Sequence, residues 1–176
     1  MKNMENMERQ IHRLGHDDVE KIRSLMTDVI SRLPSQALFA MDEEEYLYEH
    51  IGDKGEIYGA FLDGRLVAYT VLKFPGIAAD NLGREFGVPE EELPFVAVLD
   101  STVVHECARG RGLQRYFHQL REQRARERHC LYLYATVHPD NRPSINNLEA
   151  AGLTRQFTRP MYGGKLRHYY AKRLTD

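Results

Sequence analysis

The sequence predicts one mixed α/β domain, with a central mixed sheet that carries helices on both of its faces. A chain of 176 residues is long enough to bury one good core and too short for two. Its composition, 42% hydrophobic and 28% charged, is typical of a folded globular protein. Strand-like and helix-like segments follow one another in the order β-α-α-β-β-β-α-β-α-β-β. No repeat, low-complexity tract or linker interrupts them, so we expect a single domain, 1–176, with a core at about 10–174.

The first quarter of the chain predicts a short strand and two helices. The strand is expected at 11–14, and Asp17 is expected to cap the helix that follows. That helix carries apolar side chains at helical spacing, namely Val19, Ile22, Leu25, Met26 and Val29. Pro34 ends it, and a second helix is expected to begin at Asp42.

A hairpin and a buried strand are predicted in the middle of the chain. Two apolar runs, 57–62 and 66–72, are joined by the turn dipeptide Asp63-Gly64. The stretch 75–94 is interrupted by Gly, Asn and Pro, which predicts an excursion from the sheet. The mostly apolar run 95–104 is typical of a strand that is buried on both faces.

The last third alternates again. A helix is expected from Leu113 to about His129, with Leu113, Tyr116, Phe117 and Leu120 on its apolar side. A strand at 131–137 and a short helix at 144–151 follow, and Gly152 ends the short helix. The segments 153–161 and 168–173 complete the fold as an antiparallel pair around Gly163-Gly164.

Charge and cysteine content narrow the function classes. A net charge of -2 gives no global electrostatic reason to expect nucleic acid or an acidic membrane as a partner. No apolar run reaches the roughly 20 residues of a membrane span, and residues 1–10 are too polar for a secretory signal. Cys107 and Cys130 are expected to be free thiols in a reducing, cytoplasmic environment. No sequence neighbour supplies Cys107 with a base for nucleophilic catalysis.

The segment Arg109-Gly110-Arg111-Gly112 connects a buried strand to an amphipathic helix. The first N–H groups of a helix have no intrahelical partner, and the helix dipole places partial positive charge there. Glycines allow the backbone to approach an anion closely, and the arginines add full positive charges. The pattern therefore predicts a site for a phosphate or pyrophosphate.

Two common phosphate loops are excluded by the residues that follow. No Gly-Lys-Ser/Thr ending is present, which excludes the nucleoside-triphosphate loop. Arg115 stands where the dinucleotide-binding fingerprint requires its third glycine. An exposed basic turn without a ligand stays as the alternative.

The segment 103–114 resembles motif A of the GNAT N-acetyltransferase superfamily, Arg/Gln-x-x-Gly-x-Gly/Ala after a strand that ends in an apolar pair. Arg109 and Gly112 match the first two fixed positions, and Gln114 replaces the usual Gly or Ala. Asn141 and the pair Gly152-Leu153 are similar to the family's Asn…Gly-Phe motif B. The order of elements is also similar over nearly the full chain, which implies a mostly antiparallel sheet with a splayed parallel strand pair.

The resemblance implies acetyl-CoA as cosubstrate and no metal. The coenzyme A pyrophosphate would lie on the backbone amides of the motif A segment, here Arg109, Gly110, Arg111, Gly112, Leu113, Gln114 and Arg115. The pantetheine arm would pair with the backbone of the strand end, here Thr102, Val103 and Val104. A backbone N–H near Val104 would polarise the thioester carbonyl. Asn141 would hold the pantetheine or the splayed strand, although a plain turn residue is its alternative.

Direct attack of an amine on the thioester is the implied reaction. Asp100 is the candidate base because it lies two residues before Thr102 on the same strand, with an Asp that only pairs or caps as the alternative. His138 and His105 are weaker candidates, and each is expected to be a solvated loop residue instead. Leu148 occupies the position where many family members carry an acidic Tyr, so Tyr162, Tyr169 or water would have to replace that group.

Three questions stay open at this level. A non-catalytic acyl-CoA-binding module on the same fold is the alternative function. Nucleic-acid binding by the basic helix is disfavoured, because Glu122 and Arg126 form an i, i+4 pair and Glu127 interrupts the arginines, which favours a solvated helix face. The acceptor, a small-molecule or peptide amine, is not identified. The acidic runs 42–45 and 90–92 could attract a cationic amine, with plain solvated faces as the alternative. A homodimer is compatible with the resemblance.

Overall fold

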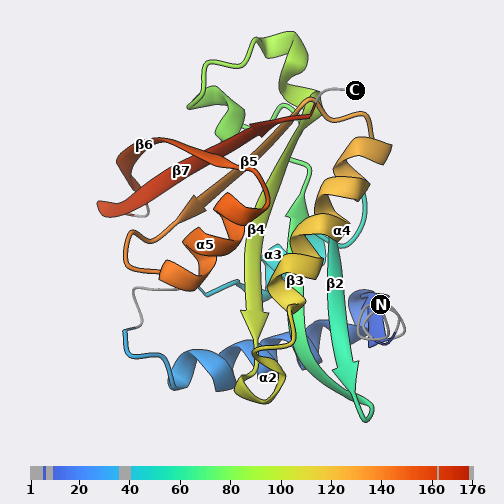
Figure 1. Cartoon of the computed structure of the whole chain (residues 1–176). Helices are drawn as coiled ribbons and strands as arrows, with labels where there is room; N and C mark the ends of the chain where they lie inside the picture. The colour runs from blue at the N-terminus through green and yellow to red at the C-terminus, as the bar shows by residue number, and fades with distance from the viewer. Residues whose placement is uncertain (1–5, 7–9, 36–40, 162, 175–176) are drawn as a thin grey trace. The chain divides into compact units, whose positions relative to one another are not determined.

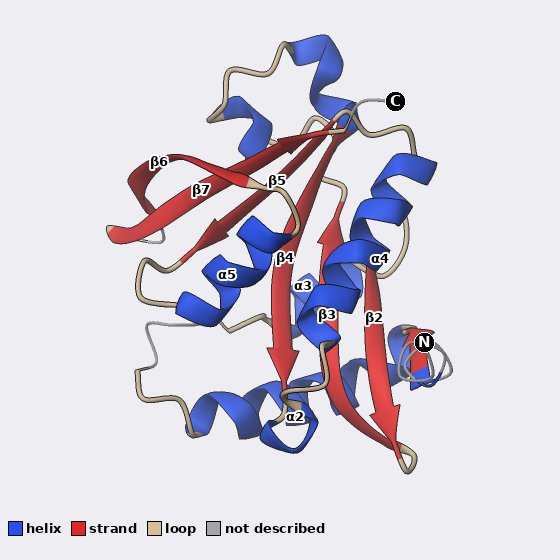
Figure 2. Cartoon of the chain, viewed as in Figure 1, coloured by secondary structure: helices blue, strands red, loops and turns tan. Residues whose placement is uncertain are grey.

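The computed structural model describes residues 6, 10–35, 41–161 and 163–174 (Figure 1). Its helices are α2 (Val19–Ser31), α3 (Glu44–Glu49), α4 (Leu113–Glu127) and α5 (Arg142–Ala150). Its strands are β1 (Ile11–Arg13), β2 (Gly55–Leu62), β3 (Arg65–Lys73), β4 (Val96–Val104), β5 (Tyr132–Val137), β6 (Thr154–Met161) and β7 (Lys165–Arg173). Short 3-10 helices are η1 (His16–Asp18), η3 (Leu82–Arg84), η4 (Glu90–Phe95) and η5 (Glu106–Ala108). The predicted order of strands and α-helices is confirmed (Figure 2).

The seven strands form one sheet in the order β1-β2-β3-β4-β5-β7-β6. The pair β4–β5 is parallel, and the printed ladders β1–β2, β5–β7 and β6–β7 are antiparallel. The parallel ladder ends at Val98↔Tyr134, although both strands continue beyond it and β5 stays paired with β7 as far as Val137. The mixed α/β fold class, with a mostly antiparallel sheet and one parallel pair, is therefore confirmed.

By its contacts the chain divides into two compact units. The first unit comprises 1–72 and 101–114, and the second comprises 73–100 and 115–176. β4 begins in the second unit and ends in the first, and the glycine-rich loop that follows it belongs to the first unit.

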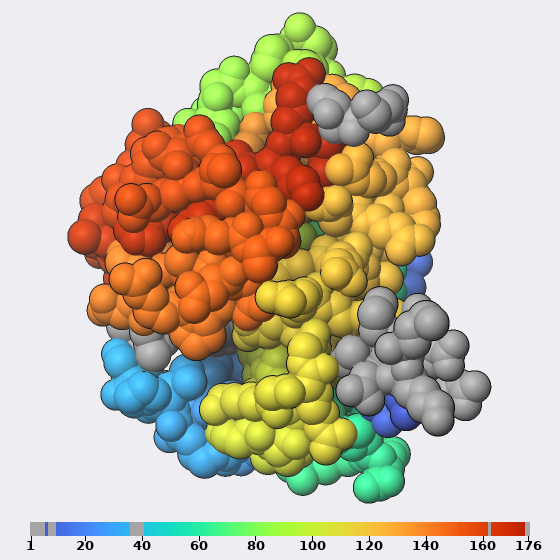
Figure 3. All heavy atoms as spheres, viewed as in Figure 1, coloured from blue at the N-terminus to red at the C-terminus, as the bar shows by residue number. Residues whose placement is uncertain are grey.

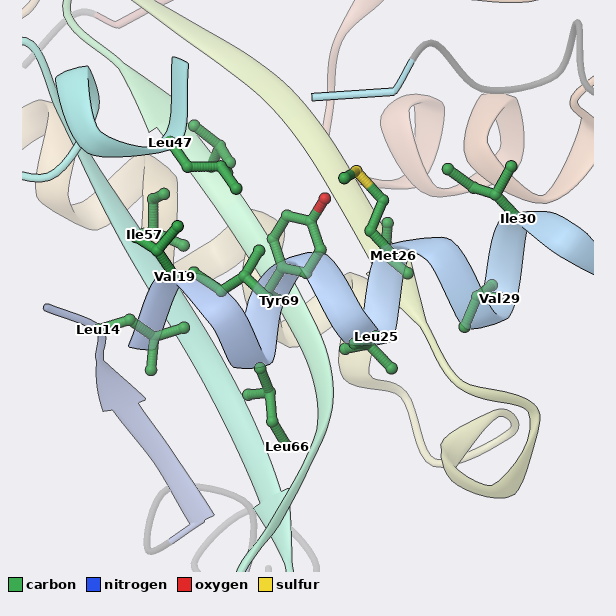
Figure 4. Packing of buried hydrophobic residues seen from close by; sticks show 13 residues of the cluster. Leu14, Val19, Leu25, Met26, Val29, Ile30, Leu47, Ile57, Leu66 and Tyr69 are labelled. Carbon is green, nitrogen blue, oxygen red and sulfur yellow. The ribbon is translucent and has the colours of Figure 1, made fainter. Parts of the chain in front are cut away.

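The core of the first unit is built on the predicted apolar stripe of α2. All five predicted stripe residues, Val19, Ile22, Leu25, Met26 and Val29, are buried. They pack in one cluster with Leu47 of α3, Ile57 of β2 and Tyr69 of β3 (Figure 4). Full burial of such an aliphatic side chain stabilises the fold by about 1.5–3 kcal/mol, so this stripe fixes α2 on the sheet.

Both helix starts in this unit differ from the prediction by one or two residues. Asp17 lies inside η1 and does not cap α2. Asp18 takes the capping place, and its carboxylate accepts a hydrogen bond of 2.8 Å from the N–H of Gly15. The second helix begins at Glu44 rather than at Asp42, which lies before it and has contacts of its own.

The hairpin turn is confirmed by its backbone angles. Asp63 and Gly64 have φ values of 50° and 77°. Positive φ at both central residues defines a type I′ turn, whose twist matches that of the flanking strands. β2 and β3 are neighbours in the sheet, as the predicted hairpin requires, and Tyr69 and Thr70 lie on opposite faces of β3.

Aromatic side chains fill the core of the second unit. Phe86, from the predicted excursion, stacks on Tyr134 of β5 with ring centroids 4.0 Å apart. Phe157 of β6 and Tyr169 of β7 complete the group, with their ring centroids 4.7 Å apart. The excursion is thus anchored in its own unit by Phe86, with Leu82 and Val88 in the same cluster, and contains the 3-10 helix η3 and most of η4.

Cys107 and Cys130 are free thiols, as predicted. Cys130 is buried, and its burial raises the pKa of the thiol to about 11. Within the described ranges, none of the helices has the length and apolar character of a membrane span.

Candidate active site

The glycine-rich loop is anchored where β4 ends. The N–H of His105 donates to the carbonyl of Val67 on β3 at 2.8 Å. The Nδ1 of His105 then accepts from the N–H of Cys107 at 3.0 Å, which caps η5. Ala108, the last residue of η5, is fully buried. His105 was predicted to be a solvated loop residue, and the structure instead gives it a local structural role.

Gly110 and Gly112 both have left-handed backbones, with φ values of 76° and 78°. A Cβ placed on either would meet nothing within 4 Å, so the protein itself does not require these glycines for packing. Among the described residues, no backbone carbonyl accepts from the N–H groups of Gly110, Arg111 or Gly112. The backbone conformation, and space for another molecule, are the physical reasons for glycine here.

The loop forms exposed surface, the yellow segment in Figure 3. The side chain of Arg109 is 52% exposed, and its Nη2 lies 3.8 Å from Oε1 of Glu106. Arg111 is exposed as well. Leu113 is buried and starts α4, whose fifteen residues give the loop a helix N-terminus with its partial positive charge.

A network of acidic and basic groups that the sequence did not predict holds the base of this loop. Arg32, just after α2, donates to Glu106 at 3.0 Å and 2.8 Å and to Asp28 at 2.5 Å and 3.0 Å. The hydrogen bonds from Arg32 lower the pKa of Glu106 to about 2, and they lower the pKa of Asp28 as well. The Nε2 of His105 lies 3.4 Å from Asp28 and 3.5 Å from Glu106. Only the i, i+4 pair Asp28–Arg32 left a signal in the sequence.

The end of β4 in the first unit combines buried apolar side chains with hydroxyl groups. Val103 and Val104 are buried, so only their backbone can serve a ligand. Thr102 is half-buried, and its Oγ1 lies 2.7 Å from Oγ1 of Thr70 on β3. Ser101 donates its hydroxyl to Asp42 at 2.9 Å, a contact across 59 residues of sequence.

Gln114 is half-buried and belongs to the first unit, whereas Asp100, Arg115 and Asn141 belong to the second. Asp100 of β4 is half-buried, and its backbone carbonyl accepts from the buried guanidinium of Arg121 at 3.2 Å. Burial, with Arg121 close by, lowers the pKa of His118 to about 3, and its Nδ1 lies 3.1 Å from Nη2 of Arg121. His118 is therefore neutral and accepts from Arg121. Arg115 lies exposed on the first turn of α4.

Asn141 and Leu148 both serve α5. The side-chain oxygen of Asn141 accepts from the N–H of Ser144 at 3.3 Å, so Asn141 is the N-cap of that helix. Leu148, at the position of the family's Tyr, is buried with Ile145. Tyr169 is also buried, which raises the pKa of its hydroxyl. Tyr162 lies outside the described residues.

His138 is also held locally. Its Nδ1 accepts a hydrogen bond of 3.0 Å from the N–H of Asp140 and lies 3.9 Å from the carboxylate of that residue. Among the described residues, no group of three or more His, Cys, Asp and Glu side chains is placed to hold a metal ion.

Family comparison agrees with the motif and its geometry. The model of the acetyltransferase (GNAT) family matches residues 22–153, well over half of the chain, and this range includes β4, the loop and α5. The chain belongs to the GNAT acetyltransferase family. No protein of curated function matches the sequence.

Solved structures share the fold of this GNAT protein at low sequence identity. A ribosomal-protein-alanine N-acetyltransferase from Brucella melitensis has a TM-score of 0.71 at 20% identity, over 93% of this chain and 99% of that one. An acetyltransferase of the GNAT family from Streptococcus pneumoniae has a TM-score of 0.69 at 15% identity, over 94% and 98%. An inferred acetyltransferase from Salmonella typhimurium, solved with its cofactor acetyl-CoA, has a TM-score of 0.70 at 14% identity, over 94% of both chains.

Proposed function

We propose that this GNAT protein is an N-acetyltransferase that transfers the acetyl group of acetyl-CoA directly to a primary amine. The observation that carries the proposal is the loop after β4. Two glycines with positive φ and two exposed arginines lead into the N-terminus of a fifteen-residue helix. This arrangement offers backbone N–H groups and positive charge to a pyrophosphate, and family membership makes coenzyme A its natural source.

The acyl-bearing arm is proposed to bind the strand end by its backbone. The side chains of Val103 and Val104 are buried in the protein, and that of Thr102 is engaged by Thr70. An extended pantetheine arm can therefore pair only with the main chain there, as an added strand does. The N–H of Val104 would then donate to the thioester oxygen and stabilise the negative charge that develops on it.

The proposed reaction needs no covalent enzyme intermediate. The amine, once it has lost a proton, attacks the thioester carbon, the C–N bond forms, and the C–S bond breaks. The second nitrogen-bound proton is released, and the thiolate leaves and is protonated by water. A thiol with a pKa of about 8–9 is a tolerable leaving group, so the buried Leu148 in place of a Tyr is compatible with turnover.

Two measurements test this proposal. Acetyl-CoA at millimolar concentration should raise the thermal midpoint, because a ligand that binds only the native state stabilises it by mass action. Release of free coenzyme A in the presence of a mixed amine pool, followed by mass spectrometry of the acetylated products, should then identify the acceptor. Binding without any acetylated product would favour a non-catalytic acyl-CoA-binding module, and the absence of binding by acetyl-CoA or longer acyl-CoAs would refute the donor assignment.

A further inference from the structure

Two hydroxyl groups of the first unit donate to the carboxylate of Asp42. It lies half-buried between α2 and α3, and its backbone N–H points to the sulfur of Met26 at 3.2 Å. Its Oδ1 accepts from the hydroxyl of Ser101 at 2.9 Å, and its Oδ2 accepts from the hydroxyl of Tyr69 at 3.0 Å. Hydroxyl groups that donate to both oxygens fix the orientation of the carboxylate.

The carboxylate of Asp42 lies next to the part of β4 that is proposed to bind the acyl-bearing arm. Ser101 immediately precedes Thr102, the first residue of the strand segment proposed to bind the acyl-bearing arm. Successive strand residues rise by about 3.3 Å, so Ser101 lies roughly 10 Å from Val104 along the strand. The reacting amine is placed in this interval, between a thioester at Val104 and the Asp42 carboxylate at Ser101.

Charge at this point favours a protonated amine. A primary amine is mostly an ammonium ion at neutral pH, and a fixed, partly desolvated carboxylate attracts it more strongly than an exposed one does. An acceptor must also lose a proton before its nitrogen can attack. One group that both attracts the ammonium and accepts its proton satisfies both needs.

We propose that Asp42, oriented by Ser101 and Tyr69, is the acceptor-binding and proton-accepting residue of this enzyme. The inference rests on the proposed function. The ammonium donates a hydrogen bond to the Asp42 carboxylate and transfers one proton to it, which leaves a neutral amine and a carboxylic acid. The amine nitrogen then forms the C–N bond with the acetyl carbon, and the thiolate leaves.

The same carboxylate selects between amines. An acceptor that carries its own carboxylate next to the amine brings a like charge toward Asp42, which is unfavourable. An acceptor whose neighbouring carbonyl is an amide, such as a peptide N-terminus, or a polyamine avoids this repulsion. The predicted substrate class is therefore a cationic amine without an adjacent carboxylate.

The test compares Asp42→Asn with Glu43→Gln. Glu43 is the next residue, is exposed, and its side chain makes no capping hydrogen bond, so its variant loses the same charge beside the site. The probes are spermidine, L-alaninamide, a trialanine amide and free L-alanine, each at saturating acetyl-CoA. Asp42→Asn should lower kcat/KM for the first three by at least about twentyfold, because a hydrogen bond to a charged group is lost, and Glu43→Gln should change it less than about threefold. Asp42→Glu should recover part of the loss.

A second comparison uses the matched amines. Wild type should prefer L-alaninamide over L-alanine, and Asp42→Asn should narrow that preference, which a merely structural role would not do. Ser101→Ala should produce a smaller loss in the same direction. For an amine that binds without turnover, calorimetric titration of the coenzyme A-loaded protein replaces kcat/KM.

Outcomes separate this inference from the proposed function. If acetyl-CoA binds equally to wild type and Asp42→Asn and the two treat every amine alike, the inference is refuted and the donor assignment stands. The inference is also refuted if acetyl-CoA binds and no probe either reacts or binds. If wild type binds no acyl-CoA, the proposed function itself has failed.

Discussion

Replacement of Gly112 by Val tests the placement of the pyrophosphate most directly. Gly112 has φ of 78°, a conformation that costs a residue with a Cβ about 1–2 kcal/mol, and a β-branched residue more. The new Cβ would meet no protein atom within 4 Å, so the loss of stability should not exceed this backbone cost by much. An effect on coenzyme A binding that exceeds this small loss of stability must therefore come from contact between the new side chain and a ligand bound on the surface of the loop.

The expected loss of coenzyme A affinity can be worked out from the hydrogen bonds that the backbone N–H groups of the loop would donate to the pyrophosphate. A Cβ on the ligand side of the loop keeps a phosphate from the close approach that short N–H···O⁻ hydrogen bonds need. Each hydrogen bond to a charged group contributes about 1.5–3 kcal/mol. Losing one such hydrogen bond therefore predicts a rise in the Kd for coenzyme A of about 10- to 10²-fold, and losing two predicts a rise of about 10²- to 10⁴-fold.

Gly87→Val is the matched control. Gly87 has φ of 72° and equally open space around its Cβ position, but lies in the excursion of the second unit. Both variants should lower the thermal midpoint by a similar amount, and calorimetric titration should show weakened coenzyme A binding only for Gly112→Val. Equal affinity in the wild type and Gly112→Val would mean that the phosphates bind elsewhere.

Three further predictions concern other parts of the candidate site. Glu106→Gln should lower the thermal midpoint at pH 7, since Arg32 stabilises the charged carboxylate; the pKa of Glu106 is depressed from 4.5 to about 2, so this difference from wild type should shrink as pH falls through that window. Asn141→Ser keeps an N-cap oxygen and removes the carboxamide N–H2, so its KM for acetyl-CoA should rise with little change in stability, whereas Asn141→Ala should lower stability by about 1 kcal/mol as well. Tyr169→Phe should lower kcat less than about tenfold, because the buried hydroxyl is a poor proton donor; a loss of two orders of magnitude with intact coenzyme A binding would make Tyr169 the acid.

Local patterns in the sequence predicted those elements whose causes are local. The α2 stripe is a period of 3.6 residues, and the hairpin is a dipeptide that tolerates positive φ at both positions. The glycine-rich loop is likewise a local arrangement of glycines, charges and a following helix. The starts of α2 and α3 were predicted one or two residues too early, because several neighbouring polar residues can occupy one capping position, as Asp17 and Asp18 can.

Contacts between distant residues left no such signal. Ser101 donates to Asp42 across 59 residues, and Arg32 donates to Glu106 across 74. Neither partner is unusual for its own segment: Asp42 belongs to an acidic run, and Arg32 ends an amphipathic helix. Only the fold brings them together, which is why Asp100 was named as the base from strand spacing alone and Asp42 was not. The role of Asp100 stays a prediction.

Leu148 occupies the position from which a Tyr would donate a proton to the leaving thiolate in many family members. The family resemblance shows from the sequence alone that Leu148 stands at this position. The structure shows that this side chain is buried beside Ile145, so it contributes to the core of its own unit. A larger, polar ring there would overpack the site at a cost of about 1–3 kcal/mol and would need a partner for its hydroxyl. Leu148 is thus better explained by packing than by chemistry, and the proposed reaction leaves protonation of the thiolate to water, which the pKa of a thiol permits.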